Sequence, residues 1–367
     1  MKCLLCCTLV PAEYEIRIKD ISNAANRFIN NFLNYFERKN ETEILSYIGV
    51  NVTQKVRTEL QELSPNYYFK TKLKIGGVLR YWGAIIRKIQ TVDCVITYNV
   101  EYTWLIAPFV ARLFKKKSLL ILADYSPSNS FNEISRKILA RIQKLCLRRY
   151  DYVIGLSEKT RKYTVHKQKF LCIEGGITAD FYNYYNNYKK LDMNRLCFMY
   201  AGILESVTGV DRLLEAFSNV NHPNIRLFIS GKGSLESLVE QATDGDERIV
   251  YLGCPSYEEY MANLERADVL VNPRNMELAE NANNFPSKIM EYLATGKRIV
   301  STKFPGWEKF SPCITFCGSD AKDIETAIRQ MIKADSWSVE SYKRNRLVAQ
   351  EYLWNEQIQK VNRLISG

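Results

Sequence analysis

The sequence predicts an α/β protein built from two doubly wound parallel-sheet domains that face a cleft. Three observations support this fold class. Short apolar segments alternate with amphipathic ones along the chain, a pattern typical of parallel sheets covered on both faces. The length of 367 residues suggests two domains rather than one small core. A polar, aromatic stretch without periodicity at 181–194 interrupts the alternation, and we place the domain boundary there.

The first half begins with an apolar segment at residues 3–10. This segment is short, lacks a small-residue cleavage site and is soon followed by Glu13, Glu15 and Arg17, so we expect a buried strand rather than a signal peptide. Further strands are expected at 43–48, 93–98, 118–124 and 152–157, with helices at 19–36, 101–114 and 133–149. No segment offers the roughly 18–20 uncharged apolar residues that a transmembrane helix needs.

The second half restarts the alternation. Strands are expected at 196–202, 226–231, 248–253, 267–273 and 298–302, and helices at 209–220, 256–266 and 286–296. In the last helix Pro286 suits the first helical position, Ser287 can satisfy free N–H groups, and Gly296 suits the stop. Lys288 and Glu291, three residues apart, share one face of its first turn. Such a helix start can hold a phosphorylated sugar, although an ordinary surface ion pair explains this fragment equally well.

Cysteine usage and acidic motifs give little support for a metal. The close cysteine pairs Cys3/Cys6 and Cys313/Cys317 lie in strand-like segments, and the chain has only two histidines. We therefore expect reduced thiols in the cytoplasm and no zinc site. Asp244-Gly245-Asp246 has the form of a metal-binding Asp-x-Asp, but it lies in a charged turn. We expect a solvated loop there, with no metal and no cofactor.

The net charge of +11 is unevenly distributed. Residues 1–190 hold 31 Lys and Arg against 16 Asp and Glu, whereas residues 191–367 hold 20 against 24. Two amphipathic stretches, 78–89 and 136–149, carry much of the excess. Core packing explains their apolar faces most simply, and attachment to an anionic membrane surface is the alternative. The basic residues of this acceptor or membrane face are Arg80, Arg87, Lys88, Arg141, Lys144 and Arg148.

Several glycine-containing pieces of the second half occur in a recognisable order. They are Tyr200-Ala201-Gly202-Ile203-Leu204, 208–217, Ile229-Ser230-Gly231-Lys232-Gly233, 251–253, 267–273 and 285–296. In this order and spacing they resemble the nucleotide-sugar-binding domain of retaining glycosyltransferase family 4, which has the GT-B fold of two Rossmann-like domains. The first half matches more loosely through 151–158 and 173–177. The tail from 352 to 365 resembles the family's last helix, which packs back on the first domain.

The resemblance implies an acceptor-binding domain at 1–185, a donor-binding domain at 195–340 and a tail helix at 341–367. It implies transfer of a sugar, with retention, from a nucleotide diphosphate sugar to a glycan or lipid-linked glycan acceptor. Bacterial surface polysaccharide synthesis at the inner face of the plasma membrane fits these partners. A divalent metal and nucleic acid are not expected.

The resemblance also assigns donor-site residues. Glu291 takes the place of a carboxylate that grips the ribose hydroxyls, and Asn283 stands where the family has a second carboxylate on the donor sugar. The family's diphosphate-binding Arg and Lys are replaced by Ile203 and Thr208. Because a diphosphate still needs cationic partners, we expect Lys288 to supply the charge. Gly202, Lys232, Arg274 and Ser287 complete the expected donor site.

Asp124, at the end of a central strand, is the one candidate catalytic carboxylate. It could take the acceptor proton or stabilise charge on the sugar, and capping of the following turn explains it equally well. Three alternatives stay open: an inverting GT-B enzyme, an inactive relative acting as a scaffold, and a nucleic-acid-binding protein built on the basic half. The last alternative lacks any nucleic-acid-binding motif.

Overall fold

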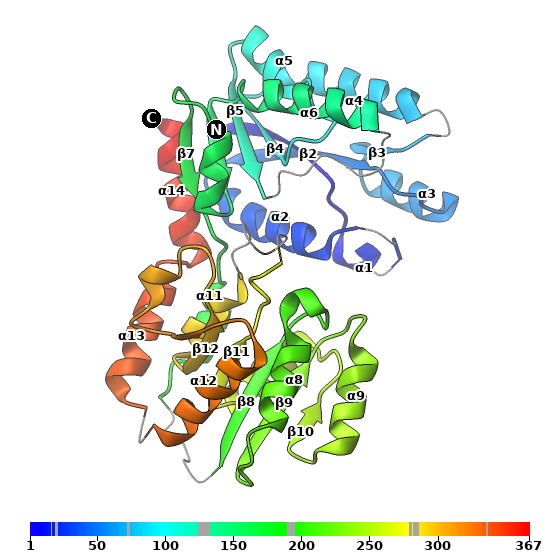
Figure 1. Ribbon diagram of the computed structural model, residues 1–367. Helices are drawn as coiled ribbons and strands as arrows, with labels where there is room; N and C mark the ends of the chain where they lie inside the picture. The colour runs from blue at the N-terminus through cyan, green and yellow to red at the C-terminus, as the bar shows by residue number, and fades with distance from the viewer. Residues whose placement is uncertain are drawn as a thin grey trace. The chain divides into compact units, whose positions relative to one another are not determined.

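The computed structural model describes residues 1–15, 17–18, 21–71, 74–123, 133–188, 195–278, 281, 286–334 and 337–367. Their contacts divide the chain into two compact units, Met1–Glu174 with Trp354–Gly367, and Gly175–Leu353. Each unit contains one parallel sheet with helices on both faces (Figure 1). The predicted fold class, α/β with two doubly wound parallel sheets, is therefore confirmed.

The first unit has a seven-stranded sheet in the order β3-β2-β1-β4-β5-β6-β7. Its strands are β1 (Lys2–Cys7), β2 (Glu41–Ile48), β3 (Tyr67–Phe69), β4 (Cys94–Tyr98), β5 (Lys117–Leu122), β6 (Tyr152–Gly155) and β7 (Lys169–Cys172). Its helices are α1 (Ala12–Glu15), α2 (Asn23–Phe36), α3 (Gln54–Leu63), α4 (Lys74–Ile89), α5 (Ala107–Leu113), α6 (Glu133–Leu147) and α14 (Trp354–Ser366), with a 3-10 turn at Glu158–Tyr163. The sequence pattern missed the short strands β3 and β7.

Alternating side chains of the first sheet pack into two layers. On one face, Leu5 and Ile96 pack with residues of α2 and α14. On the other face, Leu4 and Val95 pack with α4 and α5, and Val153 packs with α6. This period of two is what a strand buried on both faces requires. The helices α4, α5 and α6 therefore form one layer on the same face of the sheet (Figure 1).

The second unit has a six-stranded sheet in the order β10-β9-β8-β11-β12-β13. Its strands are β8 (Leu196–Ala201), β9 (Ile225–Ser230), β10 (Ile249–Tyr251), β11 (Val269–Asn272), β12 (Arg298–Thr302) and β13 (Thr315–Cys317). Its helices are α7 (Ala179–Tyr184), α8 (Val210–Ser218), α9 (Glu236–Gly245), α10 (Tyr257–Arg266), α11 (Lys288–Thr295), α12 (Ala321–Lys333) and α13 (Val339–Gln350), with 3-10 turns at Ser206–Thr208 and Trp307–Phe310. Residues of α8, α9 and α12 pack on one face, and those of α7, α10 and α11 pack on the other.

The cysteines and the apolar first strand agree with the sequence analysis. All ten cysteines are free thiols, and Cys3, Cys6 and Cys7 lie buried in or at the end of β1. Among the described residues, no helix is long and apolar enough to cross a membrane. Two expected site residues, Asp124 and Asn283, lie outside the described residues.

Candidate functional site

Three loops at the carboxyl end of the second sheet lock together through glycines. A Cβ atom at Gly231, which follows β9, would lie 1.7 Å from the carbonyl oxygen of Gly202, which follows β8. Gly231 also has φ of +139°, a region that favours glycine. At Gly209, with φ of +75°, a Cβ would lie 1.9 Å from the carbonyl oxygen of Pro273, which follows β11. The glycines of the sequence motif therefore allow the loops after β8, β9 and β11 to approach closely.

The loop after β8 is held by its own polar side chains. The hydroxyl of Thr208 donates to the carbonyl oxygens of Ile203 at 2.6 Å and Glu205 at 2.7 Å. The hydroxyl of Tyr200 also donates to the Ile203 carbonyl, at 2.7 Å. Glu205 in turn accepts the backbone N–H of Ser234 at 2.9 Å and the Ser234 hydroxyl. These bonds lower the pKa of Glu205, so the carboxylate that ties this loop to the loop after β9 stays ionised.

The two positions where the family places cations have different roles in this chain. Thr208 is committed to the turn that it closes, and the Ile203 side chain is 63% exposed. Neither side chain carries charge, so any diphosphate at this edge needs its cation from elsewhere.

Arg274 acts mainly as a clamp on neighbouring loops. Its Nη1 donates to Oδ1 of Asn281 at 2.7 Å, and Asn281 is fully buried. The Asn281 amide donates to the carbonyl oxygens of Val207 at 2.7 Å and Asn275 at 2.6 Å. Burial lowers the pKa of Arg274, which remains a cation because guanidinium ordinarily titrates far above neutrality. By contrast, Lys232 is exposed in the loop after β9.

The helix α11 begins one residue after Ser287 and ends at Gly296, which has φ of +71°. The prediction of a glycine stop is confirmed, but the prediction that Ser287 caps the helix is wrong. Ser287 is itself helical, with φ of −53° and ψ of −27°, and its side chain accepts no capping hydrogen bond. Its exposed hydroxyl is therefore not used by the helix. A Cβ at Gly175 (φ of +124°) would lie 3.7 Å from the Ser287 Cβ, so the loop before α7 lies beside this helix start.

Lys288 and Glu291 lie together in the first turn of α11. Nζ of Lys288 is 3.8 Å from Oε2 of Glu291, and the two side chains are 36% and 29% exposed. Tyr260 of α10 completes the group: its hydroxyl donates to Oε2 of Glu291 at 2.5 Å and accepts from Lys288 Nζ at 3.3 Å. The ammonium also lies 4.5 Å from the centre of the Tyr260 ring. Burial and the nearby Glu291 charge raise the pKa of Tyr260 well above its usual value, so its hydroxyl stays a donor.

One carboxylate oxygen in the Tyr260–Lys288–Glu291 cluster is available to a ligand. No described residue donates to Oε1 of Glu291, so that oxygen can accept a ligand hydroxyl while Tyr260 fixes the other. Sequence reasoning missed Tyr260, because it is one of several aromatic residues on an amphipathic helix. Its pairing with Glu291 depends on tertiary packing across 31 positions of sequence.

The first unit has a cavity of about 180 Å³ at the end of β3. Arg57, Arg80, Tyr67, Tyr68 and Phe69 are among the residues that line it, and none of the described lining residues is acidic. The Arg57 guanidinium lies over the Phe69 ring at 5.0 Å and donates from Nη2 to the Lys70 carbonyl at 3.2 Å. Its Nε is buried and has no hydrogen-bond partner among the described residues.

The basic residues expected at the acceptor or membrane face differ in their surroundings. Arg80 and Arg87 of α4 are exposed, as are Arg141, Lys144 and Arg148 in or just after α6. Lys88 is instead paired with Glu43 of β2. Burial alone would raise the pKa of Glu43, but hydrogen bonds from Lys88 and Asn66 hold it below its usual value.

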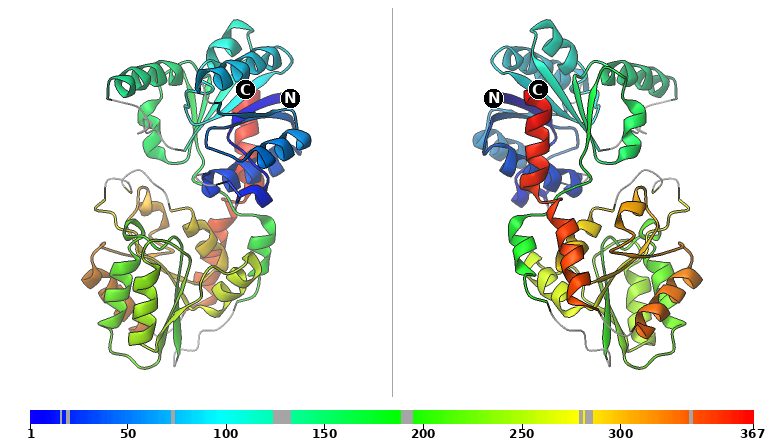
Figure 2. Two further views of the ribbon diagram at one scale, coloured as in Figure 1. Left: turned by 90° about the vertical axis from the view of Figure 1, so that its right-hand side faces the viewer. Right: turned by 90° about the vertical axis from the view of Figure 1, so that its left-hand side faces the viewer.

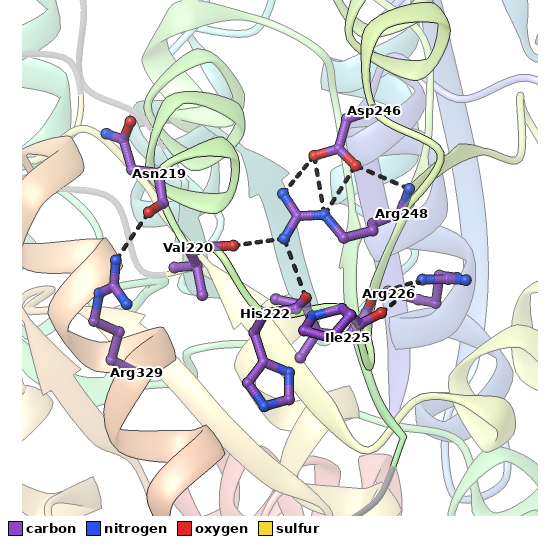
Figure 3. Close-up of polar contacts among 9 residues, drawn as sticks. Asn219, Val220, His222, Ile225, Arg226, Asp246, Arg248 and Arg329 are labelled. Carbon is purple, nitrogen blue, oxygen red and sulfur yellow. Dashed lines mark hydrogen bonds and ion pairs between the residues drawn. The ribbon is translucent and has the colours of Figure 1, made fainter.

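The Asp-x-Asp sequence is largely structural. Asp244 is exposed, but Asp246 accepts from Nη2 of Arg248 at 2.6 Å and from its Nε at 2.9 Å (Figure 3). The same Arg248 also donates to the carbonyl oxygens of Val220 and His222. The expectation of a solvated loop is therefore wrong for Asp246, whose side chain is only 19% exposed. Within the described ranges no group of three His, Cys, Asp or Glu side chains is placed to hold a metal.

Comparison with known proteins agrees with this geometry. Residues 195–334 match the family model described as Glycosyl transferases group 1. No curated protein matches the sequence. The structure is similar over its whole length to Anabaena HepE, solved in complex with UDP, with a TM-score of 0.72, 13% identity and 100% of both chains covered.

Two further solved structures have the same fold. Sucrose-phosphate synthase from Thermosynechococcus elongatus gives a TM-score of 0.68 at 14% identity, covering 100% of this chain and 98% of that one. The lipopolysaccharide outer core galactosyltransferase WaaB, in its apo form, gives 0.64 at 14% identity, covering 100% and 99%. The two parallel-sheet units thus have the GT-B fold. The chain carries a glycosyl transferases group 1 domain at 195–334.

Proposed function

We propose that the protein transfers a sugar, with retention of anomeric configuration, from a nucleotide diphosphate sugar to a glycan or lipid-linked glycan. The observation that carries this proposal is the Tyr260–Lys288–Glu291 cluster at the start of α11, beside the interlocked loops of the second sheet. A carboxylate with one oxygen fixed and one free, next to a cation, suits a ligand that carries both hydroxyls and phosphates.

In this proposal Glu291 accepts the ribose hydroxyls through Oε1, and Tyr260 holds the carboxylate in place. Lys288 provides positive charge for the diphosphate in place of the missing cations at 203 and 208. Because Lys288 lies within the first turn of a helix, the positive end of the helix dipole adds to its attraction for an anion. The free hydroxyl of Ser287 is a further donor at the same helix start.

Lys232 and Arg274 have secondary roles. Lys232 is exposed and can reach toward a phosphate, whereas Arg274 keeps the loops after β8 and β11 at a fixed separation through Asn281. Gly202 contributes by its lack of a side chain, since an added Cβ would lie 2.7 Å from the Tyr200 hydroxyl oxygen. Asp124 and Asn283 keep the roles that the sequence suggests: a carboxylate facing the acceptor or sugar, and an amide toward the donor sugar.

The cavity of the first unit suits the acceptor. Two arginines and three aromatic rings, with no acidic side chain among the described lining residues, favour an acceptor that combines a sugar ring with a negative charge. A lipid-linked glycan, as used in bacterial surface polysaccharide synthesis, has both features. No metal or cofactor is required in this scheme.

Thermal stabilisation by a panel of nucleoside diphosphates tests the donor site. We expect at least one diphosphate to raise the unfolding temperature, and no response to any of them would contradict the proposal. The anomeric configuration of the product, read by proton NMR, separates retention from the alternative of inversion. A chain that binds the diphosphate but hydrolyses or transfers no sugar would favour the alternative of an inactive scaffold.

A further inference from the structure

The layer of α4, α5 and α6 is unusually basic. We define the basic layer as residues 74–89, 107–116 and 133–149. These 43 residues include 13 Lys and Arg but only one acidic residue, Glu133. The rest of the chain holds 38 Lys and Arg against 39 Asp and Glu. The net charge of +11 thus resides almost entirely in one layer of one unit.

The three helices cover the same face of the first sheet. Figure 1 shows α4, α5 and α6 on one side of this sheet and α2 on the other, and Figure 2 shows the same arrangement from two further directions. The apolar contacts agree, since α4 and α5 share one core cluster over β1 and β4, and α6 packs over β5 and β6. The outward side of the basic layer is therefore a single surface.

This surface also exposes large apolar side chains. In α6, Ile138, Ile142 and Leu145 are 53%, 43% and 48% exposed. Their spacing of four and three residues makes one stripe along the helix. A second stripe carries Arg141 and Lys144 of the same helix and Arg148 just after it. The side chains of α6 that are buried lie at other positions, among them Gln143, Cys146 and Leu147. Core packing, the simplest explanation from the sequence, is therefore wrong for the three stripe residues.

The neighbouring helices α4 and α5 also expose apolar side chains beside basic ones. Leu113, next to Arg112 and at the end of α5, is 76% exposed, and Leu79 and Ile86 of α4 are exposed beside Arg80 and Arg87. Phe109 of α5 is also exposed, and the Arg149 guanidinium, just after α6, lies 5.9 Å from the centre of its ring. This contact joins α5 to the end of α6, so the apolar groups of the two helices belong to one surface.

We propose that the outward side of the basic layer docks on an anionic phospholipid bilayer. Basic side chains attract the negative headgroups, and the exposed Leu, Ile and Phe side chains can enter the boundary between headgroups and acyl chains. A nucleic acid could bind the basic side chains through its phosphates, but it offers no apolar surface that would cover the aliphatic stripe of α6. A second copy of the same surface would bring two strongly positive layers together.

Vesicle flotation with the full-length chain tests this proposal. We expect binding to vesicles of phosphatidylcholine and phosphatidylglycerol, and little binding to phosphatidylcholine alone. Each basic residue near an anionic surface contributes roughly fivefold to the affinity, so the triple variant R141Q/K144Q/R148Q should bind about 100-fold more weakly. The triple variant I138Q/I142Q/L145Q should also lose binding, since the helix can no longer insert its apolar stripe.

Matched control variants remove the same number of charged or apolar side chains at exposed positions outside the basic layer. K322Q/K343Q/K360Q removes three charges from exposed positions outside the basic layer, and L63Q/L238Q/L347Q replaces three exposed leucines. Both should bind vesicles as the unaltered chain does. Equal binding to neutral vesicles, equal losses in the controls, or binding of duplex DNA without vesicle binding would each overturn the proposal. So would a dimer, seen by light scattering, that only the stripe variant dissociates. Vesicle binding requires no sugar transfer, so its failure would leave the proposed reaction unaffected.

Discussion

Tyr260 donates a hydrogen bond of 2.5 Å to Oε2 of Glu291, and the Lys288 ammonium lies within 3.8 Å of the same oxygen. Two consecutive helices, α10 and α11, thus fix one carboxylate oxygen, and no described residue donates to the other. A group held in this way needs little reorganisation when a ligand arrives, which favours tight binding. The Oε2 atom of Glu291 is therefore hydrogen-bonded to the fold through Tyr260, and its Oε1 atom can accept a hydrogen bond from a ligand.

Glu291→Ala should abolish donor binding without unfolding the chain. The side chain is partly exposed and its one hydrogen bond among the described residues is that from Tyr260, whereas hydrogen bonds to a charged acceptor typically contribute roughly 1.5–3 kcal/mol each. Isothermal titration with the best-binding nucleoside diphosphate should show an affinity at least tenfold lower. The unfolding temperature without ligand should stay close to that of the unaltered chain. Near-normal nucleotide affinity would refute the ribose role of Glu291.

Tyr260→Phe should weaken donor binding less than Glu291→Ala does, by roughly five- to tenfold, the effect of one lost hydrogen bond. The ring that lies over Lys288 is kept, so the change isolates the hydroxyl. Tyr257→Phe, at an exposed position of the same helix, is the matched control and should leave the affinity unchanged. If the two variants behave alike, Tyr260 does not position Glu291.

Lys288→Gln should weaken binding of a nucleoside diphosphate more than binding of the corresponding nucleoside. The amide keeps a hydrogen-bond donor but removes the charge that we assign to the diphosphate. Comparing the two ligands by titration at low and high salt measures the charge effect, because screening reduces it at high ionic strength. A loss that is equal for both ligands would assign Lys288 to holding Glu291 rather than to phosphate binding.

Sequence reasoning predicted the parts of this fold that local patterns determine. Buried parallel strands give apolar runs, and Gly296 ends its helix in the left-handed conformation that glycine favours. Their spacing predicted that Lys288 and Glu291 share one helix face, and the family resemblance then assigned them to a donor site. Tyr260 and the Arg274–Asn281 clamp depend on contacts between separate elements, which no spacing reveals. The exposure of Ile138 was missed for a related reason: helical periodicity identifies an apolar stripe but not what covers it.

Chelation should not impair activity. The Asp246 carboxylate is already paired with Arg248, and no metal cluster occurs among the described residues. Dialysis of the enzyme against EDTA should therefore leave sugar transfer unchanged once a donor and acceptor are known. Loss of transfer that Mg²⁺ or Mn²⁺ restores would contradict this expectation.

The Asp246–Arg248 pair should make stability depend on pH. Hydrogen bonds from Arg248 hold the pKa of Asp246 below its unfolded value of 3.8. A depressed folded pKa stabilises the fold above the unfolded pKa, and this contribution is lost as pH falls through the folded pKa. Asp246→Asn should thus lower stability by about 1 kcal/mol at pH 7, with the difference shrinking below pH 4. Asp244→Asn, at the exposed neighbouring position, should have little effect in the same denaturant titrations.

Gly231→Ala should disrupt both the fold and the donor site of the second unit. The new Cβ would lie 1.7 Å from the Gly202 carbonyl oxygen, at a φ of +139° that L-residues rarely adopt. One of the loops after β8 and β9 must move, so we expect a loss of several kcal/mol of stability and weaker nucleotide binding. Gly245→Ala is the matched control, since nothing lies within 4 Å of its added Cβ at the end of α9. That change should be neutral or stabilising by about 0.4–1 kcal/mol. Equal unfolding temperatures for the two variants would show that the loops after β8 and β9 do not need to approach as closely as Gly231 allows.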